Sequence, residues 1–222
     1  MESSLTARQQ IMEIGRRLDR RGFIAGSDGN ISARLDDHTI LITPSGVAKG
    51  RMSAETMITV ALDGRKLSGD GRPSSEMAMH LSVYRARPDI SACVHAHPPY
   101  ATAFAVAGRP LDYDCLPEVI VFVGPIAMTE YAPPGTEAVP HSLTPYVADH
   151  NAFLLRNHGL LTLGRNLEEA FNRLETVEQY AKICHLASQL GAVNRIPKED
   201  YHRLVSLRQT LNSPLDNKPG ER

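Results

Sequence analysis

Two histidines one residue apart form the sharpest chemical feature of this 222-residue sequence. His95 and His97 end an apolar run that begins at Ile90, and such a run predicts a buried strand. Side chains two positions apart on a strand point to the same face, so both imidazoles can approach one metal ion. Cys93 shares this face, but it lies deeper in the apolar run and is interpreted as a core residue. The spacing is compatible with two metal ligands, and equally with a strand end whose two polar residues face water.

A third ligand has to come from elsewhere in the chain, and His158 is the best candidate. It follows the apolar run from Ala152 to Leu155, so it too is expected at the end of a buried strand, and Gly159 allows the backbone to turn closely beside it. Three neutral imidazoles leave one position of zinc open, which is the arrangement of a catalytic site. Another divalent metal is the alternative to zinc. No convergent pattern joins the other six histidines, which are His38, His80, His141, His150, His185 and His202.

A carboxylate near the open metal position would serve as general base, and Glu76 supplies one at the start of a predicted helix. The preceding Ser74 and Ser75 offer hydroxyls, and the helix start offers backbone N–H groups, which suits an anion such as phosphate. The alternative interpretation is an ordinary N-cap, for which serine is a common residue.

Two glycine-containing loops have the same two interpretations. The segments are G-N-I-S at residues 29–32 and T-P-S-G at residues 43–46. Each is either a simple turn or a loop that presents N–H and side-chain donors to phosphate.

Periodicity and turn signals predict the elements that position these residues. Helices are expected at 6–21, 75–87, 98–107, 167–190 and 198–211, and strands at 31–35, 39–43, 58–62, 65–67, 90–97, 119–123 and 153–155. Because helices and strands alternate without a break in composition, we expect one α/β domain over residues 5–211, with a mixed, largely antiparallel central sheet flanked by helices. The polar, proline-broken tail 212–222 is expected to be disordered.

Composition limits the classes of partner. The chain carries 24 Lys+Arg against 25 Asp+Glu, with no clustered basic face, so neither nucleic acid nor a membrane surface is an expected partner. An odd number of cysteines, three, favours a reducing compartment. The N-terminus shows no signal peptide, and no 18-residue apolar stretch is present, so we expect a cytoplasmic protein.

Taken together, the segments resemble the class II aldolase/adducin family, in particular its L-fuculose-phosphate aldolase type. The matching segments are G-N-I-S (29–32), T-P-S-G (43–46), S-S-E (74–76), H-A-H (95–97) and N-H-G (157–159), in an order that covers roughly Leu5 to Leu190. The resemblance implies that zinc is bound by His95, His97 and His158. It also implies that Glu76 is the catalytic acid/base and that the substrate phosphate is held by Asn30, Ser45, Gly46, Ser74 and Ser75. A homotetramer with active sites between neighbouring subunits is implied as well.

The activity implied is reversible cleavage of a ketose 1-phosphate to dihydroxyacetone phosphate and a small aldehyde through a metal-stabilised enediolate. Fuculose-phosphate aldolases look to use two tyrosines at the aldehyde end. This chain has apolar Leu116 at the aligned position of the first and no tyrosine after Tyr201. Tyr113 and Tyr131 are the candidate proton donors in their place. The loss fits a smaller or more apolar aldehyde, such as that of a 5-deoxy- or 5-alkylthiopentulose 1-phosphate.

Four alternatives compete with this interpretation. A sugar-phosphate 4-epimerase of the family usually carries Asp where this chain has Glu76, which favours the aldolase. A phosphorylated 3-oxo acid decarboxylase needs the same stabilised enediolate and would release CO₂. A three-histidine zinc hydrolase would use the same ligands but would not explain the phosphate-type loops. A non-enzymatic adducin-like scaffold is disfavoured, because such proteins lose the metal ligands that this chain keeps.

Overall fold

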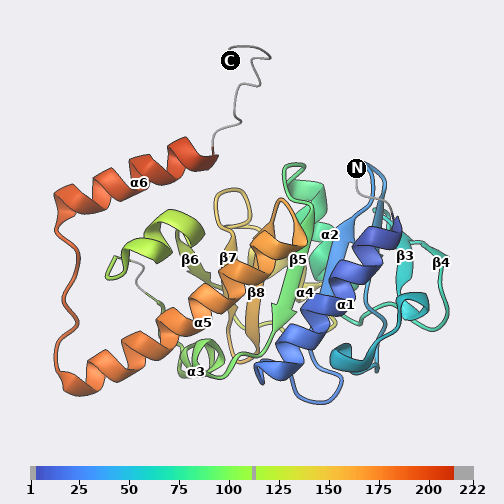
Figure 1. The fold of residues 1–222 in the computed structure, drawn as a ribbon, viewed down its shortest axis with the longest axis horizontal. Coiled ribbons are helices and arrows are strands. Elements are labelled where there is room, and N and C mark those ends of the chain that lie inside the picture. Colours follow the sequence, from blue (N-terminus) through green and yellow to red (C-terminus); the bar gives the residue numbers. More distant parts are fainter. Residues whose placement is uncertain (1–3, 112–113, 213–222) are drawn as a thin grey trace, which may run out of the picture.

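The computed structural model describes residues 4–111 and 114–212. At its centre lies an eight-stranded sheet with the strand order β4-β3-β2-β1-β5-β8-β7-β6 (Figure 1). The strands are β1 (Asn30–Arg34), β2 (Thr39–Ile42), β3 (Ile58–Ala61), β4 (Lys66–Ser68), β5 (Ala92–Ala96), β6 (Ile126–Met128), β7 (Ala152–Leu155) and β8 (Gly159–Gly164). Neighbouring strands are antiparallel except for β6 and β7, which pair in parallel. The predicted α/β class with a mixed, largely antiparallel sheet is therefore confirmed.

Helices cover both faces of this sheet (Figure 1). The α-helices are α1 (Ser4–Arg20), α2 (Met77–Ala86), α3 (Pro99–Ala107), α4 (Ala138–Leu143), α5 (Leu167–Leu190) and α6 (Lys198–Asn212), and shorter helical turns are η1 (Lys49–Arg51), η2 (Ala54–Thr56) and η3 (Val119–Val123). The buried side chains of α1, α3 and α5 belong to one core cluster, and those of α2 and α4 belong to a second. The sheet lies between these two helical layers.

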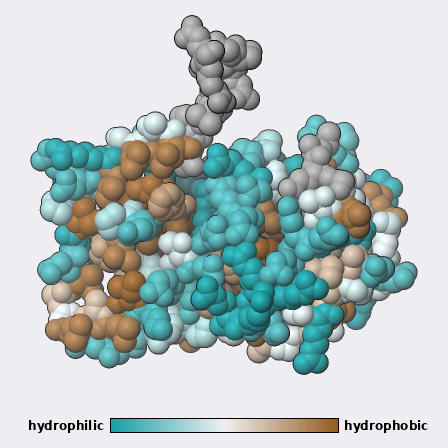
Figure 2. All heavy atoms as spheres, viewed as in Figure 1, coloured by the Kyte–Doolittle hydropathy of each residue, from teal (hydrophilic) through white to brown (hydrophobic). Residues whose placement is uncertain are grey.

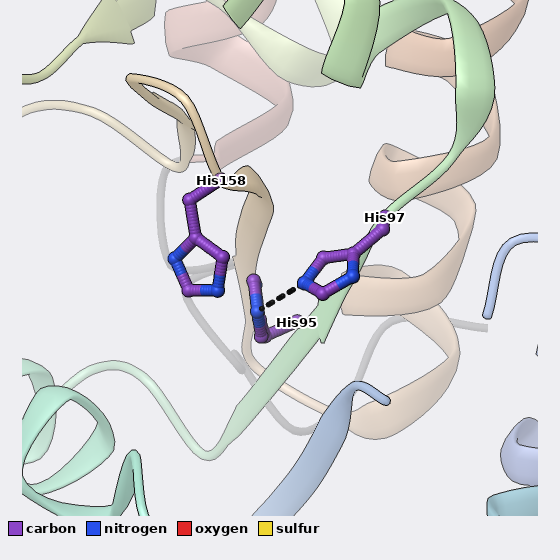
Figure 3. Close-up of side chains that lie close together, drawn as sticks. All are labelled: His95, His97 and His158. Atoms are coloured by element: carbon purple, nitrogen blue, oxygen red, sulfur yellow. Dashed lines mark hydrogen bonds between the residues drawn. The ribbon is translucent and has the colours of Figure 1, made fainter. Parts of the chain in front are cut away.

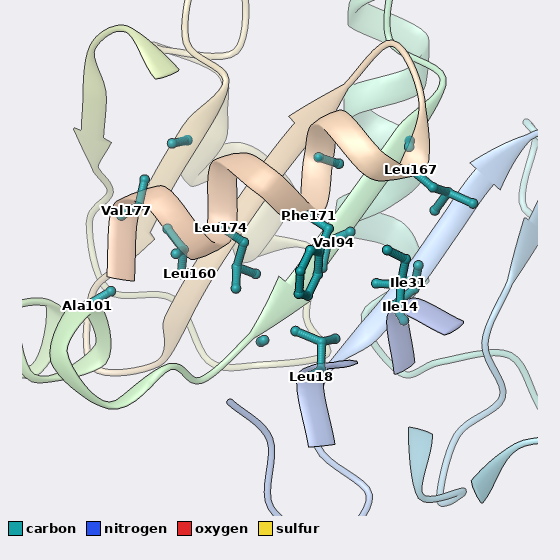
Figure 4. Close-up of a cluster of buried hydrophobic side chains, with 14 of the residues drawn as sticks. Ile14, Leu18, Ile31, Val94, Ala101, Leu160, Leu167, Phe171, Leu174 and Val177 are labelled. Carbon is teal, nitrogen blue, oxygen red and sulfur yellow. The ribbon is translucent and has the colours of Figure 1, made fainter. Parts of the chain in front are cut away.

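The first core cluster joins α1 and α5 to the centre of the sheet (Figure 4). Leu18 of α1 and Phe171 of α5 are fully buried, and both belong to the cluster that contains Ile31 of β1 and Val94 of β5. Burial of each such side chain contributes about 1.5–3 kcal/mol. This layer therefore fixes the central strands β1 and β5 against the helices behind them.

Alternation along β5 sends neighbouring side chains to opposite layers. Val94 belongs to the cluster on the α1 and α5 side, whereas Cys93 belongs to the cluster on the α2 side and is fully buried. The interpretation of Cys93 as a core residue is thus confirmed. His95 has the parity of Cys93, and its register partner on β1 is Asn30. The end of β5 therefore delivers polar side chains to the α2 side of the sheet.

The prediction of a strand over Val119–Val123 is wrong, because these residues form the π-helical turn η3. The N–H of Gly124 bonds to the carbonyl of Val119, and two arginines take other carbonyls of the turn: Arg173 from α5 reaches Phe122 and Arg208 from α6 reaches Ile120. Carbonyls that would pair with a neighbouring strand are satisfied by side chains instead. A short apolar run carries no periodicity that separates these two outcomes.

The surface is uneven in polarity. Figure 2 shows apolar side chains gathered on the side that carries α5 and α6. Large apolar residues exposed there include Leu186, Leu190, Val193, Leu207 and Leu211. No helix among residues 4–111 and 114–212 combines the length and the apolar character needed to cross a membrane. Asn212 ends α6, and the rest of the predicted tail, residues 213–222, lies outside the described part of the chain.

Candidate metal centre

Three histidine rings converge where β5 ends beside the turn between β7 and β8 (Figure 3). His95 is the fourth residue of β5, His97 follows its last residue, and His158 precedes the first residue of β8. One ligand nitrogen from each ring lies within 4.8 Å of the others. The Nε2 atoms of His95 and His97 are 3.3 Å apart. Pairing of β5 with β8 therefore gathers ligands that are 61 to 63 residues apart in the sequence.

The Nδ1 atoms of His95 and His97 face hydrogen-bond acceptors. His95 Nδ1 lies 3.0 Å from the carbonyl oxygen of Leu160, and His97 Nδ1 lies 3.4 Å from a carboxylate oxygen of Asp28. An acceptor at Nδ1 places the proton there and leaves the Nε2 lone pair for a metal. Behind His97, the carboxylate of Glu178 on α5 accepts the N–H groups of Tyr100 and Ala101 at the start of α3.

The donor set fits a tetrahedral metal. Bonds of 2.0–2.1 Å from one zinc ion to two imidazole nitrogens place those nitrogens about 3.3 Å apart at the tetrahedral angle, the separation found between His95 and His97. In the described residues, Glu76 Oε1 is buried and has no hydrogen-bond partner. A buried carboxylate oxygen that lacks a hydrogen bond and lies beside imidazoles is the environment that a cation would complete.

Glu76 lies just before α2 and faces two of the rings. Its Oε2 is 3.2 Å from His95 Nε2, and its Oε1 is 3.3 Å from His158 Nε2. Burial acts to raise the pKa of Glu76, but the charge and hydrogen bond of His95 outweigh it and hold that pKa well below its usual range. Glu76 is therefore a carboxylate at neutral pH.

The three imidazoles differ in their affinity for protons. Burial and repulsion from His95 lower the pKa of His158 to about 4, and the same two causes lower the pKa of His97. Burial acts to lower the pKa of His95 as well, but the nearby charge of Glu76 raises it above its usual value. The carboxylate thus concentrates positive charge on the innermost histidine, at the place where a metal would supply it.

The residues predicted to hold phosphate lie around one cavity of about 250 Å³ that also reaches His97, His158 and Glu76. The lining includes Asn30, Ser45, Gly46, Ser74 and Ser75. Asn30 has a further contact, because its amide Nδ2 donates to Glu76 Oε2 at 2.8 Å. Loops far apart in sequence meet here through a bridge between Pro44 and Pro73 and through the bond from Ser45 N to the carbonyl of Arg72.

Sequence reasoning missed three residues of this region. Lys49 is 2% exposed and lines the cavity, and burial lowers its pKa to about 8 although Asp28 and Glu76 pull the value upward. Asp28 lies against His97, and His80 is fully buried behind Asn30. A signal for His80 is present in the sequence, since Glu76, His80 and Tyr84 recur every four residues along one helix. No comparable spacing marks Lys49 or Asp28, which lie in loops.

Neither tyrosine predicted as a proton donor is among the described residues that line the cavity. Tyr131 is 58% exposed and is not one of the cavity's lining residues, and Tyr113 lies outside the described part of the chain. Leu116 packs against the core on the α1 and α5 side of the sheet. The role of either tyrosine stays a prediction.

Comparison with known proteins identifies the family. Residues 9–185 match the family model described as the Class II Aldolase and Adducin N-terminal domain. The chain is 36% identical over 190 residues to a 3-oxo-tetronate 4-phosphate decarboxylase of Pectobacterium atrosepticum, covering 84% of this chain and 87% of the relative. It is 33% identical over 200 residues to a 5-deoxy-D-ribulose 1-phosphate aldolase of Bacillus thuringiensis, covering 89% and 93%. A solved L-fuculose 1-phosphate aldolase superposes with a TM-score of 0.85 at 32% identity, covering 93% of this chain and 97% of that one. The chain belongs to the class II aldolase and adducin family, and it is one of the enzymes of that family.

Proposed function

We propose that this protein is a zinc-dependent decarboxylase of a phosphorylated 3-oxo sugar acid, with 3-oxo-tetronate 4-phosphate as the first substrate to test. This is the alternative to the aldolase interpretation of the sequence, and the relatives with 36% identity favour it. The observation that carries it is the cavity itself. The imidazoles of His97 and His158, the carboxylates of Asp28 and Glu76, and serine-containing loops line the cavity, and none of its lining residues in the described chain is a tyrosine.

The lack of a tyrosine among the described lining residues matters because the two reactions need different proton transfers. An aldolase must exchange a proton with the oxygen of the departing aldehyde, so it needs an acid/base group at that end of the substrate. A decarboxylase releases CO₂, which leaves without taking a proton. The described lining offers carboxylates, imidazoles and Lys49 but no tyrosine hydroxyl for the aldehyde oxygen, which suits the second reaction better.

The chemistry follows from the structure of a 3-oxo acid. The bond between C1 and C2 breaks, its electrons move toward the C3 carbonyl, and loss of CO₂ leaves an enediolate. A proton delivered to C2 then gives dihydroxyacetone phosphate. Glu76 is proposed as the group that takes up a proton from water and passes it to C2, because it lies within 3.3 Å of His95 and His158. The divalent metal, when bound by the three histidines, supplies the positive charge that stabilises the negative oxygen formed in this reaction.

The phosphate has its own place in this proposal. Ser45, Gly46, Ser74 and Ser75 lie around the same cavity as Glu76 and would hold the phosphate, with Asn30 between the two groups. Binding at a group that does not react orients the bond that breaks. The partner is thus a phosphorylated small molecule.

Cleavage of a ketose 1-phosphate is the second candidate function. The 33%-identical relative named as a 5-deoxy-D-ribulose 1-phosphate aldolase favours it. Both reactions pass through the same enediolate and yield dihydroxyacetone phosphate, so the phosphate loops and Glu76 would serve either one.

A two-part assay separates these functions. The zinc-loaded protein is incubated with 3-oxo-tetronate 4-phosphate, and released CO₂ and dihydroxyacetone phosphate are measured together; a parallel panel of ketose 1-phosphates is assayed for dihydroxyacetone phosphate alone. The proposal predicts equal amounts of both products from the acid. Turnover of a ketose 1-phosphate without turnover of the acid would establish the aldolase instead.

Two controls connect the activity to the site. Chelation should remove activity, and one equivalent of zinc per chain should restore it. Glu76→Gln should lower the rate by about 10²- to 10⁴-fold and abolish exchange of the dihydroxyacetone phosphate proton with solvent, while zinc remains bound. Unchanged exchange would remove Glu76 from the acid/base role.

We further propose a cytoplasmic homotetramer with active sites between neighbouring subunits. The apolar residues exposed along α5 and α6 support an assembly that covers them (Figure 2). The proposed cytoplasmic location rests on the odd number of cysteines, three, which favours a reducing compartment.

A further inference from the structure

A chain of buried polar side chains connects the interior of the α2 layer to Glu76. Tyr84 Oη lies 2.8 Å from Ser32 Oγ, and Ser32 Oγ lies 2.6 Å from His80 Nδ1. The other ring nitrogen of His80, Nε2, contacts Asn30 Oδ1, and Asn30 Nδ2 donates to Glu76 Oε2. The four residues behind Glu76 are each no more than 3% exposed.

Two regular elements hold this chain in line. Asn30 and Ser32 are two apart on β1 and point to one face of the sheet. His80 and Tyr84 are four apart on α2, and Glu76 lies four residues earlier, directly before the helix. Residues four apart on α2 therefore lie beside residues two apart on β1 along the whole row of buried polar side chains.

The donors and acceptors fit only one direction of hydrogen bonding. The Glu76 carboxylate can only accept, so the Asn30 amide must present its NH₂ to Glu76 and its carbonyl oxygen to His80. That oxygen needs a donor, which places a proton on His80 Nε2. Burial and the nearby charge of His95 lower the pKa of His80 to about 3, so the ring is neutral and its Nδ1 is an acceptor.

The far end of this row of polar side chains fixes the tautomer of His80. With His80 Nδ1 unprotonated, the Ser32 hydroxyl donates to it, and the Ser32 oxygen then accepts the hydroxyl proton of Tyr84. Reversing any one bond would leave two donors or two acceptors facing each other in a region without exposed surface.

We propose that His80 is a positioning residue for the acid/base carboxylate. Its ring is neutral with the proton on Nε2, and Ser32 and Tyr84 hold it in place. The ring thereby fixes the orientation of the Asn30 amide, which donates to Glu76 Oε2. This inference rests on the proposed role of Glu76. It divides the two oxygens of Glu76 by function. Oε2 is held by Asn30, whereas Oε1 has no hydrogen-bond partner among the described residues and is the oxygen left to exchange the proton with substrate carbon.

The competing explanation is that these polar residues only attach α2 to β1. Apolar side chains would do that without the cost of burying polar groups. The two explanations differ in their consequences, because loss of attachment lowers stability, whereas loss of alignment lowers the rate of proton transfer.

Three variants separate the two explanations. His80→Leu removes both ring nitrogens, and His80→Gln restores an amide nitrogen that can donate near the position of Nε2. Val83→Ala is the matched control, since Val83 is fully buried on the same helix and takes no part in the polar chain. For each variant, kcat and KM for the acid substrate, zinc content and thermal unfolding are measured.

The proposal predicts that His80→Leu lowers kcat by about tenfold or more, as part of the 10²- to 10⁴-fold that a positioned acid/base group supplies. KM and zinc content should change less than about threefold, and His80→Gln should recover much of kcat. Val83→Ala should lower stability and leave kcat unchanged. Equal kcat in wild type and in folded His80→Leu would overturn the proposal, as would an equal fall in kcat for Val83→Ala.

A measurement without substrate keeps this test separate from the proposed function. Protein labelled with ¹⁵N-histidine is examined by NMR, with the His80 signals assigned by their loss in His80→Gln. A proton on Nε2, with Nδ1 unprotonated, supports the proposal even if the decarboxylase assay fails. A proton on Nδ1 or a doubly protonated ring would overturn it whatever the substrate proves to be.

Discussion

Lys49 places a positive charge beside the cavity of a chain whose net charge at pH 7 is −1. Its Nζ donates to the carbonyl oxygens of Ser27 and Val47, at 2.7 and 2.8 Å. These bonds tie the loop before β1 to the loop after β2, and both loops border the cavity. An ammonium has three N–H donors, so a third remains for a phosphate oxygen. In the proposed function, a local charge of this kind would take the place of the basic surface that the composition lacks.

The affinity for phosphate should therefore depend on the protonation of Lys49. Burial lowers its pKa to about 8, so the unliganded protein loses this charge above that pH. We expect the Kd for dihydroxyacetone phosphate to rise between pH 7 and pH 9. In Lys49→Met the Kd at pH 7 should be higher than in the wild type. The further rise between pH 7 and pH 9 that deprotonation of Lys49 causes should be absent in this variant. Isothermal titration calorimetry at several pH values checks this, and identical profiles for the two proteins would contradict it.

Stability should respond in the opposite direction. Between pH 8 and pH 10.5 the unfolded chain keeps the lysine proton that the folded protein has lost. The unfolded state then binds more protons, so this lysine makes the free energy of unfolding increase with pH in that window. The increase should be absent in Lys49→Met. Urea unfolding of both proteins from pH 8 to pH 10 measures the difference, and parallel curves would show that Lys49 is not the group responsible.

The candidate ligands could be found from sequence, but their surroundings could not. His95 and His97 are revealed by strand parity, and His158 by an apolar run that ends beside a glycine. Asp28 and Lys49 reach the site through loops, whose course depends on tertiary contacts that no local pattern records. Asn30 was assigned to phosphate by resemblance, and its bond to Glu76 could not be anticipated without the register of β1 against β5.

At the scale of elements, the site depends on how closely the β7–β8 turn approaches β5. Gly159 begins β8, and a Cβ added there would lie 2.5 Å from His97 Cδ2 and 2.7 Å from the carbonyl oxygen of Ala96. One of these neighbours is backbone in the middle of the sheet, so it cannot move away cheaply. The absence of a side chain at this position allows His158 to approach the other two rings.

Gly159→Ala should therefore weaken metal binding. The turn must shift away from β5, which separates His158 from His95 and His97, and we expect zinc affinity to fall at least tenfold. Gly22→Ala is the control: its φ is +66° with nothing within 4 Å of an added Cβ, so it should cost about 1–2 kcal/mol of stability without affecting zinc. Competition with a chromophoric chelator measures both affinities. Equal affinities would show that the turn does not limit the site.

Strong periodicity made some elements predictable and left others hidden. The long helix predicted at 167–190 matches α5 in both bounds, and the strand predicted at 90–97 contains β5. The strands β6 and β8 and the helix α4 were not predicted. Residues of β8 are buried on both faces, so its sequence G-L-L-T-L-G shows no alternation. The prediction of a strand for η3 was wrong because the arginines that donate to its carbonyl oxygens come from α5 and α6, far away in the sequence.

At the scale of the whole molecule, apolar surface is concentrated along α5 and α6 (Figure 2). Leu190 is 91% exposed, and Leu211 is 52% exposed. Exposed apolar groups that gather on one side mark a surface that contacts another protein or another copy of the same chain. The proposed tetramer would cover part of this surface.

Assembly should therefore depend on this side of the molecule. Sedimentation at micromolar concentration should give a mass near that of four 24.4-kDa chains. Introducing charge with Leu190→Glu and Leu211→Glu together should reduce that mass. Leu67→Glu on β4 is the control, since Leu67 is also exposed but lies at the opposite edge of the sheet. A monomeric wild-type protein would exclude the tetramer.

The pairing of Asn30 with His95 across β1 and β5 links assembly of the site to the course of folding. Shifting one strand by a single residue would send every side chain of that strand to the other face. The polar residues would then enter the core beneath α1 and α5, and the ligand set would be lost. Recovered activity after dilution from denaturant would thus report how many molecules have found the native strand alignment, which spectroscopic measures of sheet content do not distinguish from a shifted one.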